Sequence, residues 1–173
     1  MTLARTEPAL PSPSRRAFLR GRVRAEQPLR PPWALAEEDF TDTCTGCHAC
    51  LPACPEQVLA RGSGGYPVFD PRLGECTFCG ECEAACEPRA LQRAAQQAPW
   101  SLVARASQAC LPLQGVVCQS CRDACGEGAI RFTPGTLHAP VIDSARCTGC
   151  GACVGTCPTA AISLQRQPEQ QAA

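Results

Sequence analysis

Hydrophobic side chains are grouped along this 173-residue chain in short runs that glycine, proline and polar residues interrupt. The segments "GYPVFD" (65–70) and "HAPVID" (138–143) hold a few apolar residues between turn-forming ones, a pattern typical of short strands. In "PEQVL", "EPRAL", "GEGAI" and "PTAAI", a proline or glycine precedes a brief apolar stretch, which predicts a turn that leads into a helical turn. The apolar runs fall short of the roughly 18 residues that a membrane-spanning helix needs, so we expect no such helix.

Cysteine is the residue type that stands out in the composition. Only 5% of the residues are aromatic, whereas the sixteen cysteines make up about 9% of the chain, near the level of a cysteine-built scaffold. They fall into four quartets with none left over: Cys44, Cys47, Cys50 and Cys54; Cys76, Cys79, Cys82 and Cys86; Cys110, Cys118, Cys121 and Cys125; Cys147, Cys150, Cys153 and Cys157.

The two halves of the sequence are related by duplication. The seven cysteines from Cys47 to Cys86 each recur 71 positions later, from Cys118 to Cys157, and "PVFD" at 67–70 is echoed by "PVID" at 140–143. A fixed offset of this kind is the signature of a repeated unit. The one exception is Cys44, because Gly115 occupies the equivalent position and the nearest substitute is Cys110.

Three of the quartets have the spacing C-x2-C-x2-C-x3-C, which in bacterial ferredoxins binds [4Fe-4S] clusters. The third quartet, C-x7-C-x2-C-x3-C, can bind one if its extra residues loop outward. We therefore expect four [4Fe-4S] clusters, with three as a minimum, bound by the sixteen cysteines listed above. The spacing leaves the ligation open: the last cysteine of a quartet completes either its own cluster or the other cluster of the same half.

Other uses of these residues are less favoured by the pattern. Structural zinc generally takes two separated C-x2-C pairs for one ion, and disulfides do not require ferredoxin spacing. We interpret His48 and His138 as solvated or hydrogen-bonded loop residues. The cysteines have no evident partner for nucleophilic catalysis, and "RGSGGYP" lacks the lysine and spacing of a phosphate-binding loop. We expect a protein without catalytic residues or a small-molecule substrate.

Charge is distributed unevenly although the formal net charge is zero. Residues 1–31 hold seven of the sixteen arginines against two glutamates, so a basic arm precedes an acidic body. The arm lacks the lysine clusters and interleaved aromatic residues that would favour a nucleic-acid or anionic-membrane partner. We expect a partly disordered arm and no binding of nucleic acid.

The arm contains the segment "SRRAFLRGRVR" (14–24), which has the form of a twin-arginine export signal. Such a signal continues into an apolar stretch of about 7–15 residues. Here Arg20, Arg22 and Arg24 stand where that stretch would be, and charged side chains are costly to place in a membrane. We therefore expect a cytoplasmic protein, in agreement with the reducing compartment that its thiols need.

Together these observations predict a fold of the α+β class: two tandem bacterial-ferredoxin-like two-cluster modules, small and loop-rich, with a basic N-terminal arm. The expected boundaries are 1–33 for the arm, 34–98 and 99–166 for the two modules, and 167–173 for a tail.

"SRRAFLRGR", "RPPWA", the four quartets with "RGSGGYP" between the first two, and the unusual third spacing together resemble NapF, a family of ferredoxin-type accessory proteins of periplasmic nitrate reductase. The resemblance covers about residues 14 to 165. It implies a cytoplasmic iron–sulfur protein that binds the precursor of the catalytic subunit NapA and assists the maturation of its iron–sulfur centre before export. It also raises the hypothesis that residues 14–19 imitate the signal of the precursor or dock beside it.

Two functions remain open at this point. The first is a maturation factor that supplies electrons or a cluster to an apo-enzyme. The second is a ferredoxin-type carrier that relays electrons to a nitrate reductase or a quinol-linked complex. Both use the same sixteen cysteines, and the arginine pair together with "RPPW" is the feature that favours the first.

Overall fold

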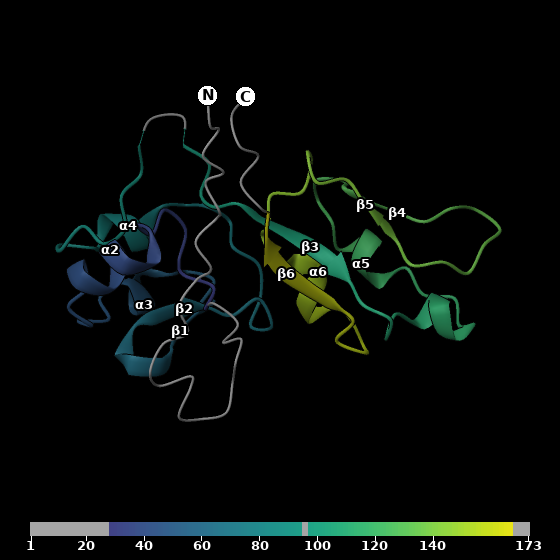
Figure 1. Ribbon diagram of the computed structural model, residues 1–173, viewed down its shortest axis with the longest axis horizontal. Coiled ribbons are helices and arrows are strands. Elements are labelled where there is room, and N and C mark those ends of the chain that lie inside the picture. The colour runs from purple at the N-terminus through teal and green to yellow at the C-terminus, as the bar shows by residue number, and fades with distance from the viewer. Residues whose placement is uncertain (1–27, 95–96, 168–173) are drawn as a thin grey trace, which may run out of the picture.

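The computed structural model describes residues 28–94 and 97–167, which form two halves side by side along the long axis (Figure 1). We call residues 28–98 the N-terminal half and residues 99–167 the C-terminal half. The arginine pair at 14–19 and the tail beyond residue 167 lie outside the described residues. The helices of the described residues are short, and none of them has the length and apolar character needed to cross a membrane.

The N-terminal half contains α2 (Glu37–Thr43), α3 (Cys50–Ala53), β1 (Leu59–Arg61), the 3₁₀ helix η1 (Ser63–Gly65), β2 (Pro67–Phe69) and α4 (Glu81–Ala84). The C-terminal half contains β3 (Leu102–Ala106), the 3₁₀ helix η2 (Leu111–Gln114), α5 (Ser120–Asp123), β4 (Ile130–Arg131), β5 (Val141–Ile142), α6 (Ala152–Gly155) and β6 (Ile162–Arg166). The strands predicted in "GYPVFD" and "HAPVID" are confirmed as β2 and β5.

The segments that follow the quartets differ from the prediction, because the helical turns lie inside the quartets and not after them. In each segment a tight turn leads directly to a strand or a strand-like bridge. The turn residues have left-handed backbone geometry at equivalent positions: Gln57, Arg89, Gly128 and Ala160. Each donates its N–H to the carbonyl of the preceding cysteine, Cys54, Cys86, Cys125 and Cys157, at 3.0–3.1 Å. A left-handed residue ends helical geometry, which explains why no helix continues there.

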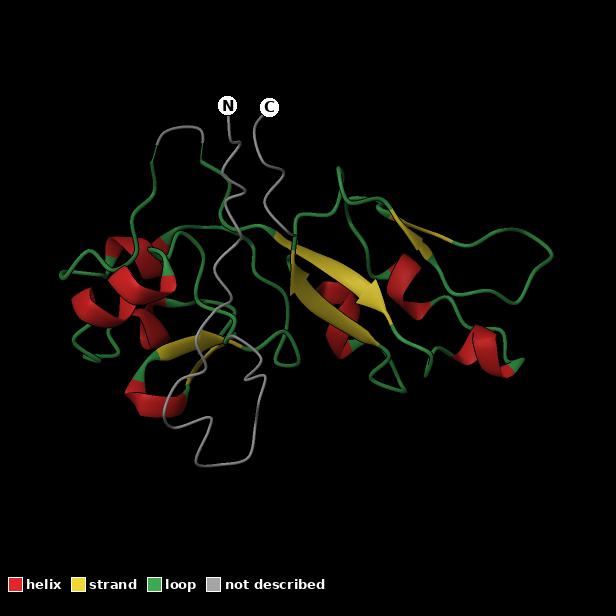
Figure 2. Ribbon diagram, in the orientation of Figure 1, coloured by secondary structure: helices red, strands yellow, loops and turns green. Residues whose placement is uncertain are grey.

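The strands form three antiparallel pairs (Figure 2). Each half has a hairpin of two strands that follow one another in the chain: β1–β2 with Leu59 opposite Phe69, and β4–β5 with Ile130 opposite Ile142. In the C-terminal half the first and last strands, β3 and β6, form a second pair, a ladder of five residue pairs. Its counterpart in the N-terminal half is a single bridge between Ala34 and Leu91. Pro31 and Pro32 precede that bridge and have no N–H to donate, so the ladder cannot extend.

The "RPPW" segment, which the sequence analysis places in the arm, packs into the N-terminal half. Pro31 and Pro32 are fully buried, and Trp33 is 3% exposed. Arg30 is also buried and holds Glu37 through two hydrogen bonds of 2.9 and 2.6 Å. Its guanidinium lies 4.8 Å from the centre of the Phe40 ring. "RPPW" is therefore part of the packed body, and only residues 14–19 remain as a feature of the arm that could dock a partner.

Candidate iron–sulfur cluster sites

The structure regroups the sixteen cysteines into four sites. Each site takes three cysteines from one quartet and its fourth from the other quartet of the same half. Site I has Cys44, Cys47, Cys50 and Cys86. Site II has Cys54, Cys76, Cys79 and Cys82. Site III has Cys110, Cys118, Cys121 and Cys157. Site IV has Cys125, Cys147, Cys150 and Cys153. Of the two ligation schemes that the spacing leaves open, the geometry matches the crossed one.

The sulfurs of sites II, III and IV each line a small cavity, and the three cavities have nearly the same size. Within residues 28–94 and 97–167, no group of three or more Cys, His, Asp or Glu side chains is close enough together to hold a single metal ion. Four sulfurs spread in this way fit a cluster of several iron atoms better than one tetrahedral ion.

The short helices separate the two sites of each half. The third cysteine of every quartet lies in a helix and is buried: Cys50 in α3, Cys82 in α4, Cys121 in α5 and Cys153 in α6. The fourth cysteine follows the end of the same helix, where the backbone has left or is leaving helical geometry. Because α3 packs on α4 and α5 packs on α6, that last sulfur reaches the site of the neighbouring helix.

Burial keeps the third cysteine of each quartet protonated in the absence of a metal. Burial, and then the neighbouring sulfurs, raise the pKa of the Cys82 and Cys153 thiols to about 12. The same causes raise the pKa of Cys50 and Cys121 to about 11, where backbone N–H groups partly offset them. Iron and sulfide bind thiolates, so binding of a cluster must displace these protons.

Backbone N–H groups are directed at sulfurs in the C-terminal half. Ala104 donates to Cys147 Sγ at 3.4 Å, Ala129 to Cys125 Sγ at 3.4 Å and Ala161 to Cys157 Sγ at 3.1 Å. Although burial acts to raise the pKa of Cys157, the N–H groups around it lower that pKa below its usual value. Hydrogen bonds of this kind stabilise negative charge on the sulfur, as a cluster ligand requires.

Site III is formed although the spacing of its quartet is irregular. The extra residues between Cys110 and Cys118 form η2 and an outward loop in which Val117 is 78% exposed. Gly115 ends η2 in a left-handed conformation (φ 80°), which suits glycine. Cys110 itself is 7% exposed and lies with Cys157 and Cys118. The outward loop that the sequence analysis requires for this site is therefore present.

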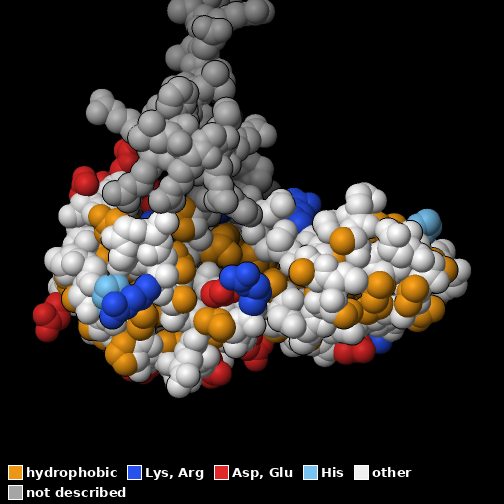
Figure 3. All heavy atoms as spheres, turned by 90° about the horizontal axis from the view of Figure 1, so that it is seen from below, with side chains coloured by type: hydrophobic (Ala, Val, Ile, Leu, Met, Phe, Trp, Pro, Cys, Tyr) orange, Lys and Arg blue, Asp and Glu red, His pale blue; other side chains and the backbone are white. Residues whose placement is uncertain are grey.

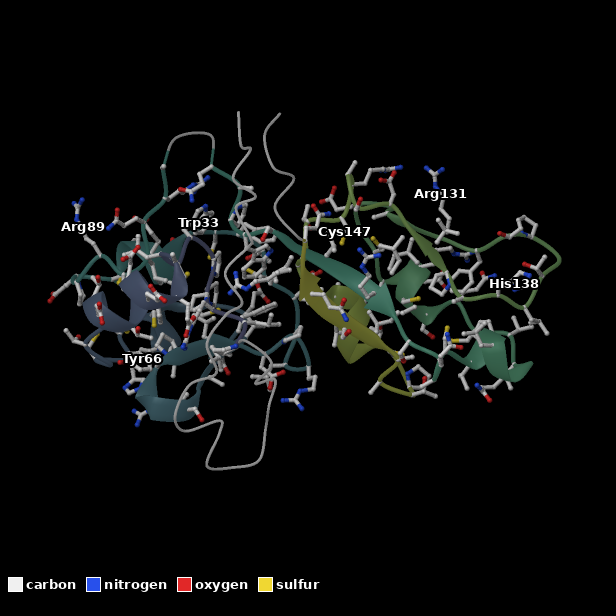
Figure 4. The ribbon with its side chains drawn as sticks, in the orientation of Figure 1. Trp33, Tyr66, Arg89, Arg131, His138 and Cys147 are labelled. Atoms are coloured by element: carbon white, nitrogen blue, oxygen red, sulfur yellow. The ribbon has the colours of Figure 1, made fainter. Side chains whose placement is uncertain are left out.

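Neither of the two histidines belongs to sites I to IV. His48 makes a hydrogen bond of 2.7 Å between Nε2 and the carbonyl of Gly65, which confirms the expectation of a hydrogen-bonded loop residue. His138 is exposed and lies at the outer end of the C-terminal half, whereas Cys147 lies near the middle of the molecule (Figure 4).

Comparison with known proteins agrees with this geometry. A model of a 4Fe-4S dicluster domain matches residues 43–91, which hold the first two quartets, and a model of a 4Fe-4S binding domain matches residues 140–163, which hold the last. Small loop-rich halves of the α+β class, four cysteine groups and these two matches define the class of the protein: it is an iron–sulfur protein of the ferredoxin type with 4Fe-4S clusters.

The relatives give the family more narrowly. The chain is 41% identical over 155 residues to the ferredoxin-type protein NapF of Escherichia coli strain K12, covering 88% of this chain and 94% of that protein. It is 37% identical to NapF of Haemophilus influenzae, covering 87% and 92%. It is 32% identical to the methylamine utilization ferredoxin-type protein MauM of Methylophilus methylotrophus, covering 86% and 74%. The chain belongs to the NapF family of ferredoxin-type proteins, which are non-catalytic iron–sulfur proteins.

Proposed function

We propose that sites I to IV each bind one [4Fe-4S] cluster through four cysteine thiolates, and that each half is a two-cluster ferredoxin module. The exchange of fourth cysteines within each half carries this proposal, because it gives every site three sulfurs from one quartet and a fourth from the other. When bound, the clusters supply one-electron transfer. The protein contributes the thiolates and the N–H groups that stabilise them. It also buries the third cysteine of each quartet, so that water has little access to that ligand.

We further propose that the protein acts in the cytoplasm as an accessory to the maturation of periplasmic nitrate reductase. It would bind the precursor of the catalytic subunit NapA before export and supply electrons or iron–sulfur loading. Membership of the NapF family supports this role, and the charge pattern agrees with a protein partner. Residues 34–98, which follow the basic arm, hold ten acidic side chains and only four arginines. We expect no small-molecule substrate and no nucleic acid among its ligands.

The test is co-purification of the tagged, cluster-loaded chain with NapA in its precursor and exported forms. The proposal predicts retention of the precursor and little retention of the exported form. Equal retention of both, or of neither, would contradict it.

A truncation then tests the arm. The deletion must end at residue 27, because Arg30, Pro31 and Pro32 are part of the packed body. If residues 14–19 dock the partner, the truncated chain loses the precursor while its iron content stays the same. Unchanged capture would overturn the docking role of the arm and leave the maturation role to the body.

The second candidate function is an electron carrier to a nitrate reductase or a quinol-linked complex. It is favoured by the backbone contact between Cys76 and Cys150, which brings sites II and IV together across the two halves, as a chain of clusters requires. A carrier is oxidised by the mature enzyme system repeatedly and binds precursor and mature forms alike. Rapid reoxidation of the reduced protein by the mature complex, without selective capture of the precursor, would favour this function over maturation.

A further inference from the structure

The two halves of the molecule touch at the loops of sites II and IV. The backbone N–H of Cys76, a site II cysteine, donates a hydrogen bond of 2.8 Å to the carbonyl of Cys150, a site IV cysteine. Site II and site IV are therefore neighbours across the boundary between the halves.

Aromatic side chains bridge the same two loops. Phe78, within the loop of site II, meets the ring of Trp100 edge to face at a centroid distance of 5.5 Å. Trp100 in turn donates from Nε1 to the carbonyl of Thr148, in the loop of site IV, at 2.9 Å. Phe69 also packs on Trp100, with 4.9 Å between the ring centroids. The space between the two sites is thus filled by packed protein.

A glycine permits this close approach. A Cβ atom on Gly151 would lie 2.8 Å from Cβ of Pro71 and 3.0 Å from Cζ of Phe69, both in the N-terminal half. The equivalent residue of the repeat is Gly80, which has nearly the same backbone angle (φ 88° against 93°). A Cβ there would meet only the flexible end of Arg93, at 3.5 Å. The same motif position is therefore an interface position in one half only.

Sites I and III lie at the two ends of the molecule. Site I is formed around α2 and α3, and site III around η2 and α5, and these elements are on opposite sides of the interface between the halves (Figure 1). Within each half, the crossed cysteines make the outer site the immediate neighbour of the inner one.

We propose that the protein conducts electrons along a single ordered path, from site I to site II and then to site IV and site III. The path crosses between the halves once, at the Cys76–Cys150 contact. The cysteines of sites II and IV would hold the two clusters on either side of this contact, and these clusters would supply one-electron exchange in which oxidation of one is balanced by reduction of the other. The inference rests on cluster binding at the four sites and is independent of the nitrate reductase partner.

Two variants with equal iron content test the path. One keeps sites II and IV and carries Cys44→Ser, Cys47→Ser, Cys110→Ser and Cys118→Ser. The other keeps sites I and III and carries Cys76→Ser, Cys79→Ser, Cys147→Ser and Cys150→Ser. Electron paramagnetic resonance of each dithionite-reduced protein reports magnetic interaction between its two clusters. We expect a split or broadened, fast-relaxing signal from the first and the sum of two isolated signals from the second. An uncoupled first variant, or a coupled second one, would overturn the path.

A second pair of variants, in the otherwise complete chain, decides the question if a quadruple variant fails to load. Gly151→Ala and Gly80→Ala place a Cβ at nearly the same backbone angle, but only the first places it against the opposite half. With iron content matched, the path predicts that Gly151→Ala weakens the magnetic interaction between clusters seen in the reduced wild-type protein. Gly80→Ala should preserve that interaction. The same coupling in both variants would contradict the proposed crossing. None of these measurements involves NapA, so their failure is distinct from failure of the maturation role.

Discussion

Cys86 lies beside Cys50, in the site that holds the first three cysteines of the first quartet, and not with the three cysteines that precede it in the sequence. Crossed ligation follows from this neighbourhood, and it has a direct test. In the variant that keeps sites II and IV, Cys86→Ala should leave about eight irons per chain, because Cys86 does not belong to site II. Cys54→Ala in the same background should reduce the count to about four. Sequential ligation requires the reverse result, which an iron assay would reveal.

Gly149 supports a second prediction, about close approach in site IV. A Cβ on Gly149 would lie 2.5 Å from the carbonyl of Leu102 and 2.8 Å from Trp100 Nε1. Gly46 has the same "CTGC" context and nearly the same angle (φ 68° against 72°), but its Cβ would have 3.6 Å to the nearest atom. We expect Gly46→Ala to cost about 1–2 kcal/mol from backbone strain alone. Gly149→Ala should cost about 1–3 kcal/mol more because of the overlap.

The measurement for this pair is cluster bleaching on heating under identical anaerobic conditions. Phe78 is an internal control, since it occupies the matching place in the second quartet with a left-handed angle (φ 56°) despite its large side chain. Left-handed geometry is therefore tolerated in this motif. The close contacts around Gly149 account for the expected difference in stability between the two variants. Equal bleaching temperatures for Gly46→Ala and Gly149→Ala would contradict this explanation.

Arg30 gives a third prediction, about stability. Arg30→Met removes a buried guanidinium that holds Glu37 and the carbonyl of Pro67, and leaves the half-exposed Glu37 without its partner. Hydrogen bonds to charged groups contribute about 1.5–3 kcal/mol, so a loss of about 2 kcal/mol is expected. Arg72→Met is the matched control, because Arg72 pairs with Asp70 through a side chain that is 78% exposed. Protease resistance of the loaded proteins should fall for the first variant and stay unchanged for the second.

A fourth prediction concerns the direction of electron flow. Residues 99–166 hold three acidic side chains and five arginines, in contrast to the acidic N-terminal half. Backbone hydrogen bonds to sulfur occur in both halves, at Cys50 and Cys76 in the N-terminal half and at Cys125, Cys147 and Cys157 in the C-terminal half, so the difference in charge distinguishes the two halves. Net charge and hydrogen bonds to sulfur both set the potential of a cluster. The C-terminal clusters should therefore accept electrons at higher potential than the N-terminal ones.

A potentiometric titration of the complete protein, followed by electron paramagnetic resonance, measures this order. Glu81→Gln and Glu83→Gln, on α4, should raise the potentials of the N-terminal clusters and narrow the gap, whereas Glu127→Gln, in the other half, should widen it. An N-terminal cluster that is reduced first would reverse the inferred direction.

Much of the site could be predicted from the sequence, because cysteine spacing is set by the chemistry of the cluster. The duplication and the strands at β2 and β5 follow from local patterns that need no tertiary information. Crossed grouping does not, since Cys54 and Cys86 have the same spacing in either scheme and only the packing of α3 on α4 distinguishes them. The charge pattern places Arg30 in the basic arm, because it does not reveal the ion pair with Glu37. Trp100 gave no signal, because its partners Phe78 and Thr148 are distant in sequence.

The measurement that tests the central claim most directly is the content of iron and acid-labile sulfide per chain in protein purified without oxygen. Four cysteine groups completed by exchanged fourth ligands predict about sixteen irons and as many sulfides in a brown protein. About twelve would mean that one site, with site III the first candidate, is empty. A colourless protein with zinc, or a protein that keeps its fold after complete removal of iron, would contradict the account.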